Sequence, residues 1–377
     1  MSKVLLGDVA VEHKETCKGS KDGYPIVGLE HLIPEEITLT AWDEGSENTF
    51  SKMFRKGNVL FGRRRAYLKK AAVAPFDGIC SGDITVIEAK PDRILPELLP
   101  FIIQNDDLFD FAVGKSAGSL SPRVKWEHLK NYEFELPDME KQKELAELLW
   151  AMDNTKKSYQ KLIAATDELV KSQFMELFGD PVTNTQGREV RPFKDFMLDI
   201  RYGTSQPPTF NELGEFKFIR ATNIKAGRIT ENGMLRISAD EAAKIEKCRL
   251  NGNEIIIVRS GANTGDTCVV TDEYRDQYAG YDIIVTLNLE IANPVFFNEL
   301  MNTHYMQAII KPLTVRAAQP HINSEQVQNL PMLVVPLQEQ EQFATFVRQS
   351  DKSKFELEKA LSELTATYKR IIAENLG

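Results

Sequence analysis

The chain begins a helix in nearly the same way at two places, and this repeat constrains its fold more than any other feature. The stretch VVPLQEQEQFATFV resembles the upstream stretch ELPDMEKQKELAEL, so that Pro336 and Glu339 follow Pro137 and Glu140 by 199 positions. Short repeat arrays have periods of about 20 to 50 residues. A period of about half of a 377-residue chain instead indicates two large copies of one unit.

Four further pairs of segments match in the same order along the chain. GNVLFGR resembles GNEIIIVR, and SGDITVI resembles GYDIIVT, with Asp83 and Asp282 again 199 positions apart. LPELLPFIIQNDDLFDFA parallels NPVFFNELMNTHYMQAII, and SLSPRVKWEHLKN parallels AAQPHINSEQVQN, which pairs Pro122 with Pro320. Ordered matches at nearly one offset are hard to obtain by chance, so the duplication extends along the whole unit.

Each copy ends in a long helix with a heptad pattern. Steps of four and three alternate in both helices, with Lys156 and Lys354 as interruptions, and matching positions lie 198 apart. This spacing holds one stripe of a helix against a partner. One such helix is also typical of a globular core, but two in the same register favour antiparallel packing on each other. The predicted pairing residues are Leu145, Leu149, Met152, Tyr159, Ile163 and Val170 in the first helix, and Phe343, Val347, Leu357, Leu361, Leu364 and Tyr368 in the second.

Helix breakers divide the chain into four parts. Gly179 and Pro181 are expected to end the first helix, and about 38 helical residues would span roughly 57 Å. The predicted parts are a globular domain at 1–137, a helix at 138–180, a second globular domain at 181–337 and a helix at 338–377. Strand-like runs at 84–87, 255–258 and 283–287 are mixed with short helices, which predicts an α+β fold.

The sequence lacks the usual signatures of catalysis. It contains no GxxxxGK[ST] loop and no HExxH motif, and its five histidines are scattered, so neither a catalytic site nor a metal site is predicted. NPVF at 293–296 resembles the Asn-Pro-Pro-aromatic loop of amino-methyltransferases, but Val295 replaces the second proline. The matching stretch of the first copy is LPEL, so we interpret NPVF as the start of a helix.

Cysteine spacing and hydropathy predict the compartment. The four cysteines are widely separated and form no CxxC pair, which is typical of structural thiols in a reducing compartment. No apolar run of about 18 residues and no signal-peptide pattern occurs. We therefore expect a cytoplasmic location.

Basic residues are concentrated in one segment of an acidic chain. The net charge of -9 alone argues against a nucleic-acid partner. Residues 52–70 nevertheless hold eight Lys or Arg and no acid, a density typical of phosphate contacts and also found on solvated charged faces. In the second copy, RYGTSQPP, IRATNIKAGR, RSGANTGD and VRAAQPHIN supply side chains that bond base edges and phosphates, although such residues also simply form turns.

With this layout the chain resembles the DNA-specificity subunits of type I restriction-modification systems. The resemblance covers essentially the whole chain. It rests on the duplication, on PDMEKQ and PLQEQE at the starts of the long helices, on FMELFGDP, and on RYGTSQPP followed by FKFIRATNIKAGRI. The two copies depart from each other at Lys141, which stands opposite Gln340, and the second copy has no run as basic as 52–70.

The resemblance implies two target-recognition domains, each reading half of a bipartite target in double-stranded DNA, and a coiled coil of two helices that sets the spacing. It also implies that this chain has no catalysis and no cofactor of its own. Two modification subunits would bind S-adenosylmethionine and methylate adenines, and restriction subunits would add cleavage dependent on ATP and Mg. The alternatives are an interaction scaffold that reads no sequence and a free-standing DNA-modifying enzyme.

The candidate DNA-binding residues come from the basic run and the polar loops. In the first copy they are Arg55, Lys56, Arg63, Arg64, Arg65, Lys69, Lys115, Ser119, Arg123 and Lys125. In the second copy they are Arg201, Tyr202, Thr204, Ser205, Gln206, Arg220, Asn223, Arg259, Ser260, Asn263, Thr264, Arg316, Gln319, His321 and Asn323.

Overall fold

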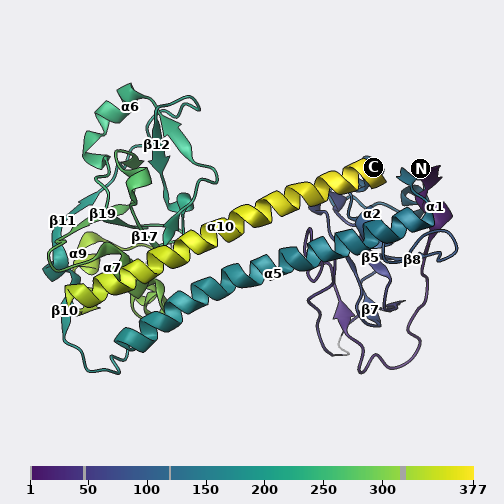
Figure 1. Cartoon of the computed structure of the whole chain (residues 1–377), viewed down its shortest axis with the longest axis horizontal. Coiled ribbons are helices and arrows are strands. Elements are labelled where there is room, and N and C mark those ends of the chain that lie inside the picture. Colours follow the sequence, from purple (N-terminus) through teal and green to yellow (C-terminus); the bar gives the residue numbers. More distant parts are fainter. Residues whose placement is uncertain (1, 46–47, 119, 315–319) are drawn as a thin grey trace. The chain divides into compact units, whose positions relative to one another are not determined.

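The chain folds into two compact units (Figure 1). The structure, a computed structural model, describes residues 2–45, 48–118, 120–314 and 320–377. Unit 1 comprises Met1–Lys161 and Leu357–Gly377, and unit 2 comprises Leu162–Glu356. In the described ranges, no helix is long and apolar enough to cross a membrane. The predicted boundaries of the recognition domains at 137, 181 and 337 concern function and stay a prediction.

Unit 1 is built around a four-stranded antiparallel sheet with the strand order β2-β8-β5-β6. A second sheet has the order β3-β7-β4, with β3 parallel to β7, and β1 pairs with β9. The strands are β1 (Ser2–Leu5), β2 (Ala10–Glu12), β3 (Ile26–Val27), β4 (Lys52–Phe54), β5 (Val59–Gly62), β6 (Ala71–Val73), β7 (Gly78–Cys80), β8 (Ile84–Ala89) and β9 (Glu133–Leu136). The short helices are α1 (Leu6–Val9), η1 (Ala66–Leu68), α2 (Leu99–Ile103), α3 (Asp106–Gly114) and α4 (Trp126–Leu129).

Unit 2 repeats the main sheet with the order β11-β19-β16-β17, and β10 pairs with β20 as β1 pairs with β9. Its three-stranded sheet has a different order, β15-β12-β18, and β13 and β14 form a hairpin. The strands are β10 (Val190–Pro192), β11 (Met197–Tyr202), β12 (Phe216–Ile219), β13 (Ile224–Lys225), β14 (Arg228–Ile229), β15 (Leu235–Ile237), β16 (Glu254–Ile257), β17 (Thr267–Val269), β18 (Tyr278–Ala279), β19 (Ile283–Leu287) and β20 (Pro331–Leu333).

Short helices cover the sheets of unit 2. They are η2 (Phe193–Phe196), η3 (Ala221–Asn223), α6 (Ala239–Lys244), η4 (Glu246–Cys248), η5 (Asp272–Tyr274), α7 (Pro294–Asn302), η6 (Met306–Ile310), α8 (Lys311–Thr314) and α9 (Ser324–Gln328). The Asn293 side chain caps α7 by accepting a hydrogen bond from the N–H of Val295, which confirms that NPVF starts a helix. The α+β class and the internal repeat are confirmed.

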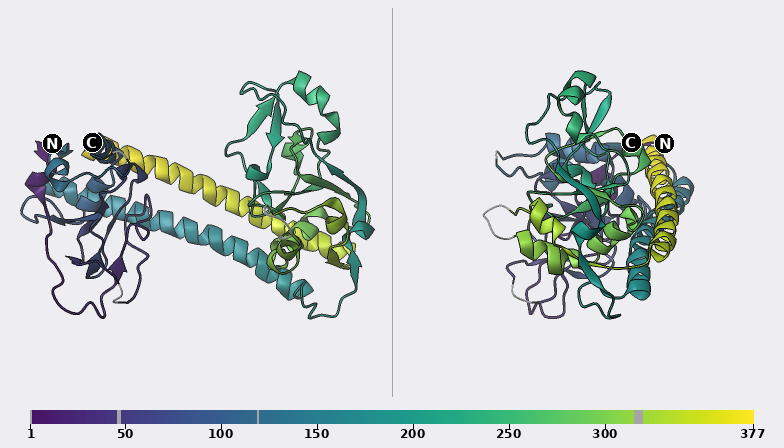
Figure 2. Two further views of the ribbon diagram at one scale, coloured as in Figure 1. Left: turned by 180° about the vertical axis from the view of Figure 1, so that it is seen from behind. Right: turned by 90° about the vertical axis from the view of Figure 1, so that its left-hand side faces the viewer.

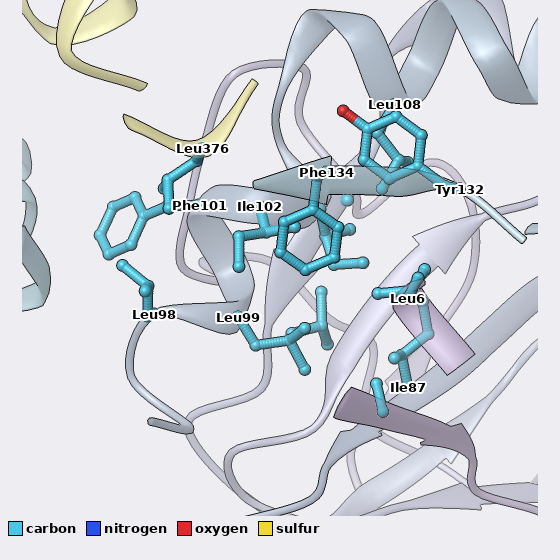
Figure 3. Close-up of a cluster of buried hydrophobic side chains, with 14 of the residues drawn as sticks. Leu6, Ile87, Leu98, Leu99, Phe101, Ile102, Leu108, Tyr132, Phe134 and Leu376 are labelled. Carbon is cyan, nitrogen blue, oxygen red and sulfur yellow. The ribbon is translucent and has the colours of Figure 1, made fainter. Parts of the chain in front are cut away.

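The core of unit 1 lies between the main sheet and the helices. Ile87 of β8, Leu99 and Ile102 of α2 and Phe134 of β9 are buried in it, and Figure 3 shows their side chains grouped together. Leu376, near the end of the long helix α10 (Leu337–Leu376), belongs to the same cluster. The C-terminal part of α10 is therefore an integral part of this unit.

The long helices α5 (Met139–Phe178) and α10 pack on each other in each unit, as predicted (Figure 2). In unit 1, Leu145 and Leu149 of α5 share a core with Leu376. In unit 2, Phe174 of α5 lies 5.5 Å from Phe343 of α10, measured between ring centroids. The start of one helix thus meets the end of the other in both units, so the pair is antiparallel. Met152, Val170 and Val347 are also buried, whereas Tyr159, Ile163, Leu357, Leu361, Leu364 and Tyr368 are partly buried, and their individual pairing contacts stay a prediction.

Helix α5 ends where the breakers are placed. Its last residue is Phe178, and Gly179 follows with a φ of +75°, a left-handed conformation in which a glycine commonly ends a helix. At Gly179 a Cβ atom would lie 2.8 Å from the Thr185 hydroxyl oxygen, so the position also lacks room for a side chain.

The counterpart of Gln340 is Gln142, and the pairing of Gln340 with Lys141 is wrong. Both glutamines are buried in the first turn of a long helix and accept a hydrogen bond from a backbone N–H, that of Leu95 at 2.9 Å and that of Asn293 at 2.8 Å. Each donates to the carbonyl five residues earlier. The prolines and glutamates repeat at an offset of 199, but the buried contacts repeat at 198.

Candidate nucleic-acid interface

In unit 1, the loop after β5 lies against the loop before α4. The N–H of Val124 donates to the carbonyl of Arg63 at 2.9 Å, and the N–H of Arg65 donates to the carbonyl of Pro122 at 2.8 Å. Arg64 and Arg123 face each other in an antiparallel bridge. We call residues 63–65 and 121–124 the unit 1 loop pair.

The guanidinium groups of this loop pair are held by one carboxylate. Asp83, which precedes β8, accepts hydrogen bonds from Arg123 Nε at 2.7 Å and from Arg123 Nη2 at 3.2 Å. Arg64 Nη1 lies 3.6 Å from the same carboxylate, and Arg64 Nε donates to the Ser121 hydroxyl. The hydrogen bond from Arg123 lowers the pKa of Asp83, so the carboxylate stays charged. Both arginine side chains are partly exposed, and their contacts with Asp83 and Ser121 fix their orientation.

The same backbone arrangement occurs in unit 2. The N–H of Ile322 donates to the carbonyl of Arg259 at 3.0 Å, and the N–H of Gly261 donates to the carbonyl of Pro320 at 3.3 Å. Ser260 and His321 form the antiparallel bridge that Arg64 and Arg123 form in unit 1. Residues 259–261 and 320–322 are therefore the unit 2 loop pair.

The side chains of the unit 2 loop pair differ from those of unit 1. The Arg259 guanidinium carbon lies 4.4 Å from the ring centroid of Tyr202 and 4.5 Å from that of Tyr281. Asp282 accepts the backbone N–H of Arg259 at 3.1 Å. Burial raises the pKa of Asp282 to about 6, although the nearby Arg259 lowers it. Asp83 thus contacts the side chains of two arginines, whereas Asp282 accepts a hydrogen bond from the backbone of one arginine.

Much of the basic run at 52–70 has partners within the chain, and its role in DNA binding stays a prediction. Arg55 pairs with Glu15 and Asp77, and Lys69 lies 2.5 Å from the carboxylate of Asp106. Lys52 and Lys70 donate to the backbone carbonyls of Ile84 and Leu29. Acids from distant parts of the chain neutralise much of the run, because the fold brings them beside it.

Several candidate DNA-binding residues of unit 2 form ion pairs or hydrogen bonds within the chain. Arg201 lies 2.7 Å from the buried carboxylate of Glu254, and Asn223 is buried with its amide bonded to the carbonyls of Thr230 and Asn232. Thr264 is buried and donates to the carbonyl of Gly261. Arg201, Asn223 and Thr264 therefore have partners within the chain, and their role in DNA binding stays a prediction. Thr204 is likewise buried against Gln206, and Asn323 caps α9.

The other candidates lie on loops and element ends. Lys56, Arg65, Lys115, Lys125, Ser205 and Gln206 are exposed, whereas Arg220 and Asn263 are half-buried and donate to backbone carbonyls of Gly233 and Ala221. Ser119, Arg316 and Gln319 lie outside the described residues.

Four residues that contact the arginines of the two loop pairs were missed as candidates. They are Asp83, Ser121, Tyr281 and Asp282, which position the arginines. The 199-residue separation of Asp83 and Asp282, which matches the repeat, could have indicated that both aspartates have a role. Tyr281 had no such signal, because Arg259, which it contacts, is distant in the sequence.

One cluster of described residues has metal-ligating chemistry. Ligand atoms of Glu30, His31 and Asp43 lie within 4.8 Å of one another. Glu30 and Asp43 are exposed, and His31 Nδ1 already accepts the N–H of Gly28 at 2.9 Å. The expectation that the chain holds no metal stays a prediction. The cysteines are free thiols: Cys80, Cys248 and Cys268 are buried and Cys17 is half-buried, as expected for structural thiols.

Comparison with protein families decides what kind of chain carries these loop pairs. A family model described as type I restriction modification DNA specificity domain matches residues 4–165 and again residues 189–365. The chain belongs to the type I restriction-modification DNA-specificity family. This confirms the resemblance inferred from the sequence, and each copy of the specificity domain contains one loop pair.

Known proteins similar to this specificity-family chain include the specificity subunit of the type I restriction enzyme EcoDI from Escherichia coli. The two are 26% identical over 179 residues, which is 46% of this chain and 36% of that subunit. The match thus spans 36% of the curated relative's length.

Two solved structures share the fold of the specificity-family chain. The S subunit of a type I restriction-modification system from M. genitalium has a TM-score of 0.64 at 12% identity, over 98% of this chain and 94% of that one. A chain from a structural study of the assembly and conformational transition of the type I restriction-modification system has a TM-score of 0.55 at 20% identity. That match covers 99% of this chain and 97% of the other.

Proposed function

We propose that this chain is the sequence-specific DNA-recognition subunit of a type I restriction-modification complex, and that each loop pair reads one half of a bipartite target in double-stranded DNA. The observation that carries the proposal is the repetition of one backbone arrangement with different side chains. Arg64 and Arg123 occupy the bridge in unit 1, and Ser260 and His321 occupy it in unit 2. A common frame with different donors and acceptors is what two different half-sites require.

The chemistry of both loop pairs suits base and phosphate contacts. Guanidinium groups bond guanine edges and phosphates in a bidentate manner, whereas hydroxyl and imidazole groups bond with less base selectivity. The arginines of unit 1 are oriented by Asp83, which reduces the conformational freedom that DNA binding would otherwise remove. The charge added by either loop pair is small, so we expect tight binding only when partner subunits add positive surface.

The helices α5 and α10 would set the spacing between the half-sites and dock two modification subunits. Support for two equivalent docking surfaces comes from the matched helix starts, where Gln142 and Gln340 make the same backbone contacts. In this proposal the chain itself performs no catalysis. S-adenosylmethionine for adenine methylation would bind to the modification subunits, and ATP and Mg would act in the complete complex with restriction subunits.

The test is a genome-wide map of adenine methylation in the source cell with and without this gene. We expect loss of one split motif with two short specified halves around a fixed gap. Variants then assign the halves: Arg64→Ala should relax one half and His321→Ala the other. Arg93→Ala and His304→Ala, which change exposed residues outside the loop pairs, should leave the motif unchanged. An unchanged map in cells that express the partner subunits would contradict the proposal and favour an interaction scaffold.

A further inference from the structure

Two aromatic rings lie against the guanidinium of Arg259 and form a clamp. The guanidinium carbon lies 4.4 Å from the ring centroid of Tyr202 and 4.5 Å from that of Tyr281, and both distances are within the range of cation–π contacts. The hydroxyl of Tyr202 is itself fixed by Ser324, whose Oγ lies 2.9 Å away and whose N–H donates to it at 2.9 Å. One side of the clamp is therefore anchored to the start of α9, and the other, Tyr281, is partly exposed.

The polar atoms of Arg259 are incompletely used. Its Nε is buried and has no hydrogen-bond partner among the described residues. Arg201 and Arg228 of the same unit, in contrast, both contact carboxylates. A buried donor that lacks a partner is costly and commonly occurs at functional sites. Arg259 is thus held in place without having its hydrogen-bonding capacity satisfied.

We propose that Arg259 reads a guanine in the half-site of unit 2 through the major groove, and that Tyr202 and Tyr281 are positioning residues for this contact. The inference rests on the proposed function and names the base that it would recognise. An aromatic ring over the face of a guanidinium leaves its in-plane edge as the donor surface. An in-plane pair of donors fits the O6 and N7 acceptors of guanine.

A phosphate contact would explain the arrangement less well. Phosphates also accept bidentate contacts from arginine, but such contacts carry no sequence information directly and need not distinguish one base edge from another. A clamp that fixes orientation is useful where one base edge must be distinguished from another. Arg259 also lies beside Ser260, whose bridge partner is His321, so it belongs to the loop pair and not to a peripheral surface.

The clamp is specific to unit 2. Asp83 is the counterpart of Asp282, so the counterpart of Tyr281 is Gly82. At Gly82 a Cβ atom would meet no atom within 4 Å, which means that open space stands where unit 2 places a ring. Arg63, the counterpart of Arg259, has a buried Nε without a described partner as well, but glycine stands where unit 2 has Tyr281. We therefore assign clamped guanine reading to unit 2 alone.

The experiment uses the complex of this chain with its modification subunits and duplexes that carry the mapped motif. Replacing guanine by 7-deazaguanine removes only the N7 acceptor. At one position of the half that responds to His321→Ala, we expect this change to weaken binding by the wild-type complex about tenfold. Arg259→Ala should lose about tenfold to a hundredfold of the discrimination at that base pair and should be insensitive to 7-deazaguanine.

The clamp is tested with Tyr281→Ala and Tyr281→Phe. We expect Tyr281→Ala to lose part of the guanine discrimination and Tyr281→Phe to retain it, because the phenylalanine keeps the ring. Arg191→Ala, an exposed arginine of β10 in the same unit, is the matched control and should bind as the wild type does. Equal thermal unfolding midpoints across the series would show that the fold is intact.

Three outcomes would overturn the inference. They are a half-site without a G·C pair, a response to 7-deazaguanine that persists in Arg259→Ala, and a uniform loss of affinity at every sequence in that variant, which would indicate a phosphate contact. A wild-type complex that recognises no split motif at all would instead contradict the proposed function. The two failures are therefore distinguishable.

Discussion

At one matched position, the helix pair packs on an aromatic ring in unit 1 and lies beside an ionisable side chain in unit 2. In unit 1, Phe101 of α2 lies 5.0 Å from Trp150 of α5 and 6.1 Å from Tyr368 of α10, measured between ring centroids. In unit 2, the position that corresponds to Phe101 is Glu299 of α7. One repeat therefore has an apolar contact where the other has an ionisable one.

The charged group of unit 2 joins both long helices to the β13–β14 hairpin. Lys354 Nζ of α10 lies 2.7 Å from both carboxylate oxygens of Asp167 of α5. Arg228 pairs with Asp351 of α10 and lies 3.8 Å from Asp167. Glu299 lies close enough to these acids for them to raise its pKa. The repeat therefore preserves the backbone register, while the side chains at matched positions have diverged from apolar to charged.

The largest effect is expected where the two units are alike. Gln340 satisfies three backbone groups, the N–H of Asn293 and the carbonyls of Ile291 and Val335. Gln340→Ala would remove all three of these hydrogen bonds from a buried side chain, and we expect a loss of about 2–3 kcal/mol in the free energy of unfolding.

The matched variant in unit 1 sharpens this prediction. Gln142 bonds only two backbone groups, so Gln142→Ala should lose about 1–2 kcal/mol. Gln338→Ala, an exposed glutamine in the same turn as Gln340, should change stability by less than about 0.5 kcal/mol. Urea denaturation of the full chain measures all three, and equal losses at Gln340 and Gln338 would contradict the assigned role.

Local patterns predicted much of the fold. The heptads located both long helices, alternation located β8, β16 and β19, and Asn293 with Pro294 marked the start of α7. The register at the helix starts was not predictable in this way. The prolines and glutamates of the helix starts repeat at one offset, but the buried glutamines repeat at another. Which residue is buried depends on contacts with Leu95 and Asn293, and these are distant in the sequence.

The candidate site was predictable only in part. Sequence reasoning identified both loops of each pair, because their polar and glycine-rich stretches recur at matching places. It could not separate Arg64, which is held at the loop pair, from Arg55, which is neutralised by Glu15 and Asp77. Charge balance around an arginine is set by residues that the fold brings near, so a basic run in the sequence is a poor measure of a basic surface.

A smaller effect tests the two lysines that interrupt the heptads. Lys354 is buried and contacts Asp167, whereas Lys156 of unit 1 is more exposed and donates to the carbonyl of Glu35 at 3.3 Å. Lys354→Met should lose about 1–2 kcal/mol in the free energy of unfolding, because it leaves Asp167 poorly compensated, although partial exposure of that acid limits the loss. Lys156→Met should lose less than about 0.5 kcal/mol.

Urea titrations of both lysine variants at low and high salt provide the measurement. A loss at Lys354 that persists at high salt is expected for a pair shielded from solvent, since screening acts mainly on exposed charges. Equal losses in the two variants would contradict this prediction. The contact of Lys354 with Asp167 in unit 2 would then stabilise the chain no more than the contact of Lys156 with Glu35 in unit 1.

The smallest effect concerns the pH dependence of unit 2. Burial, Asp351 and Asp167 raise the pKa of Glu299 from 4.5 to about 7, against the opposing influence of Arg228 and Asn298. The folded chain therefore retains a proton on Glu299 at pH values at which the unfolded chain has released it. Stability should accordingly fall as the pH rises from about 4.5 to about 7.

Glu299→Gln removes the titration and keeps a side chain of similar shape. Because Glu299 is only partly buried, we expect this variant to gain about 1 kcal/mol over the wild type at pH 8 and almost nothing at pH 5. Phe101 of unit 1 has no proton to lose, so the whole difference should come from unit 2. Urea denaturation at both pH values measures it. A gain of the same size at pH 5 would show that the variant is stabilised by better packing and not by removal of the titrating carboxyl. The difference between Phe101 and Glu299 would then be a difference in side-chain shape.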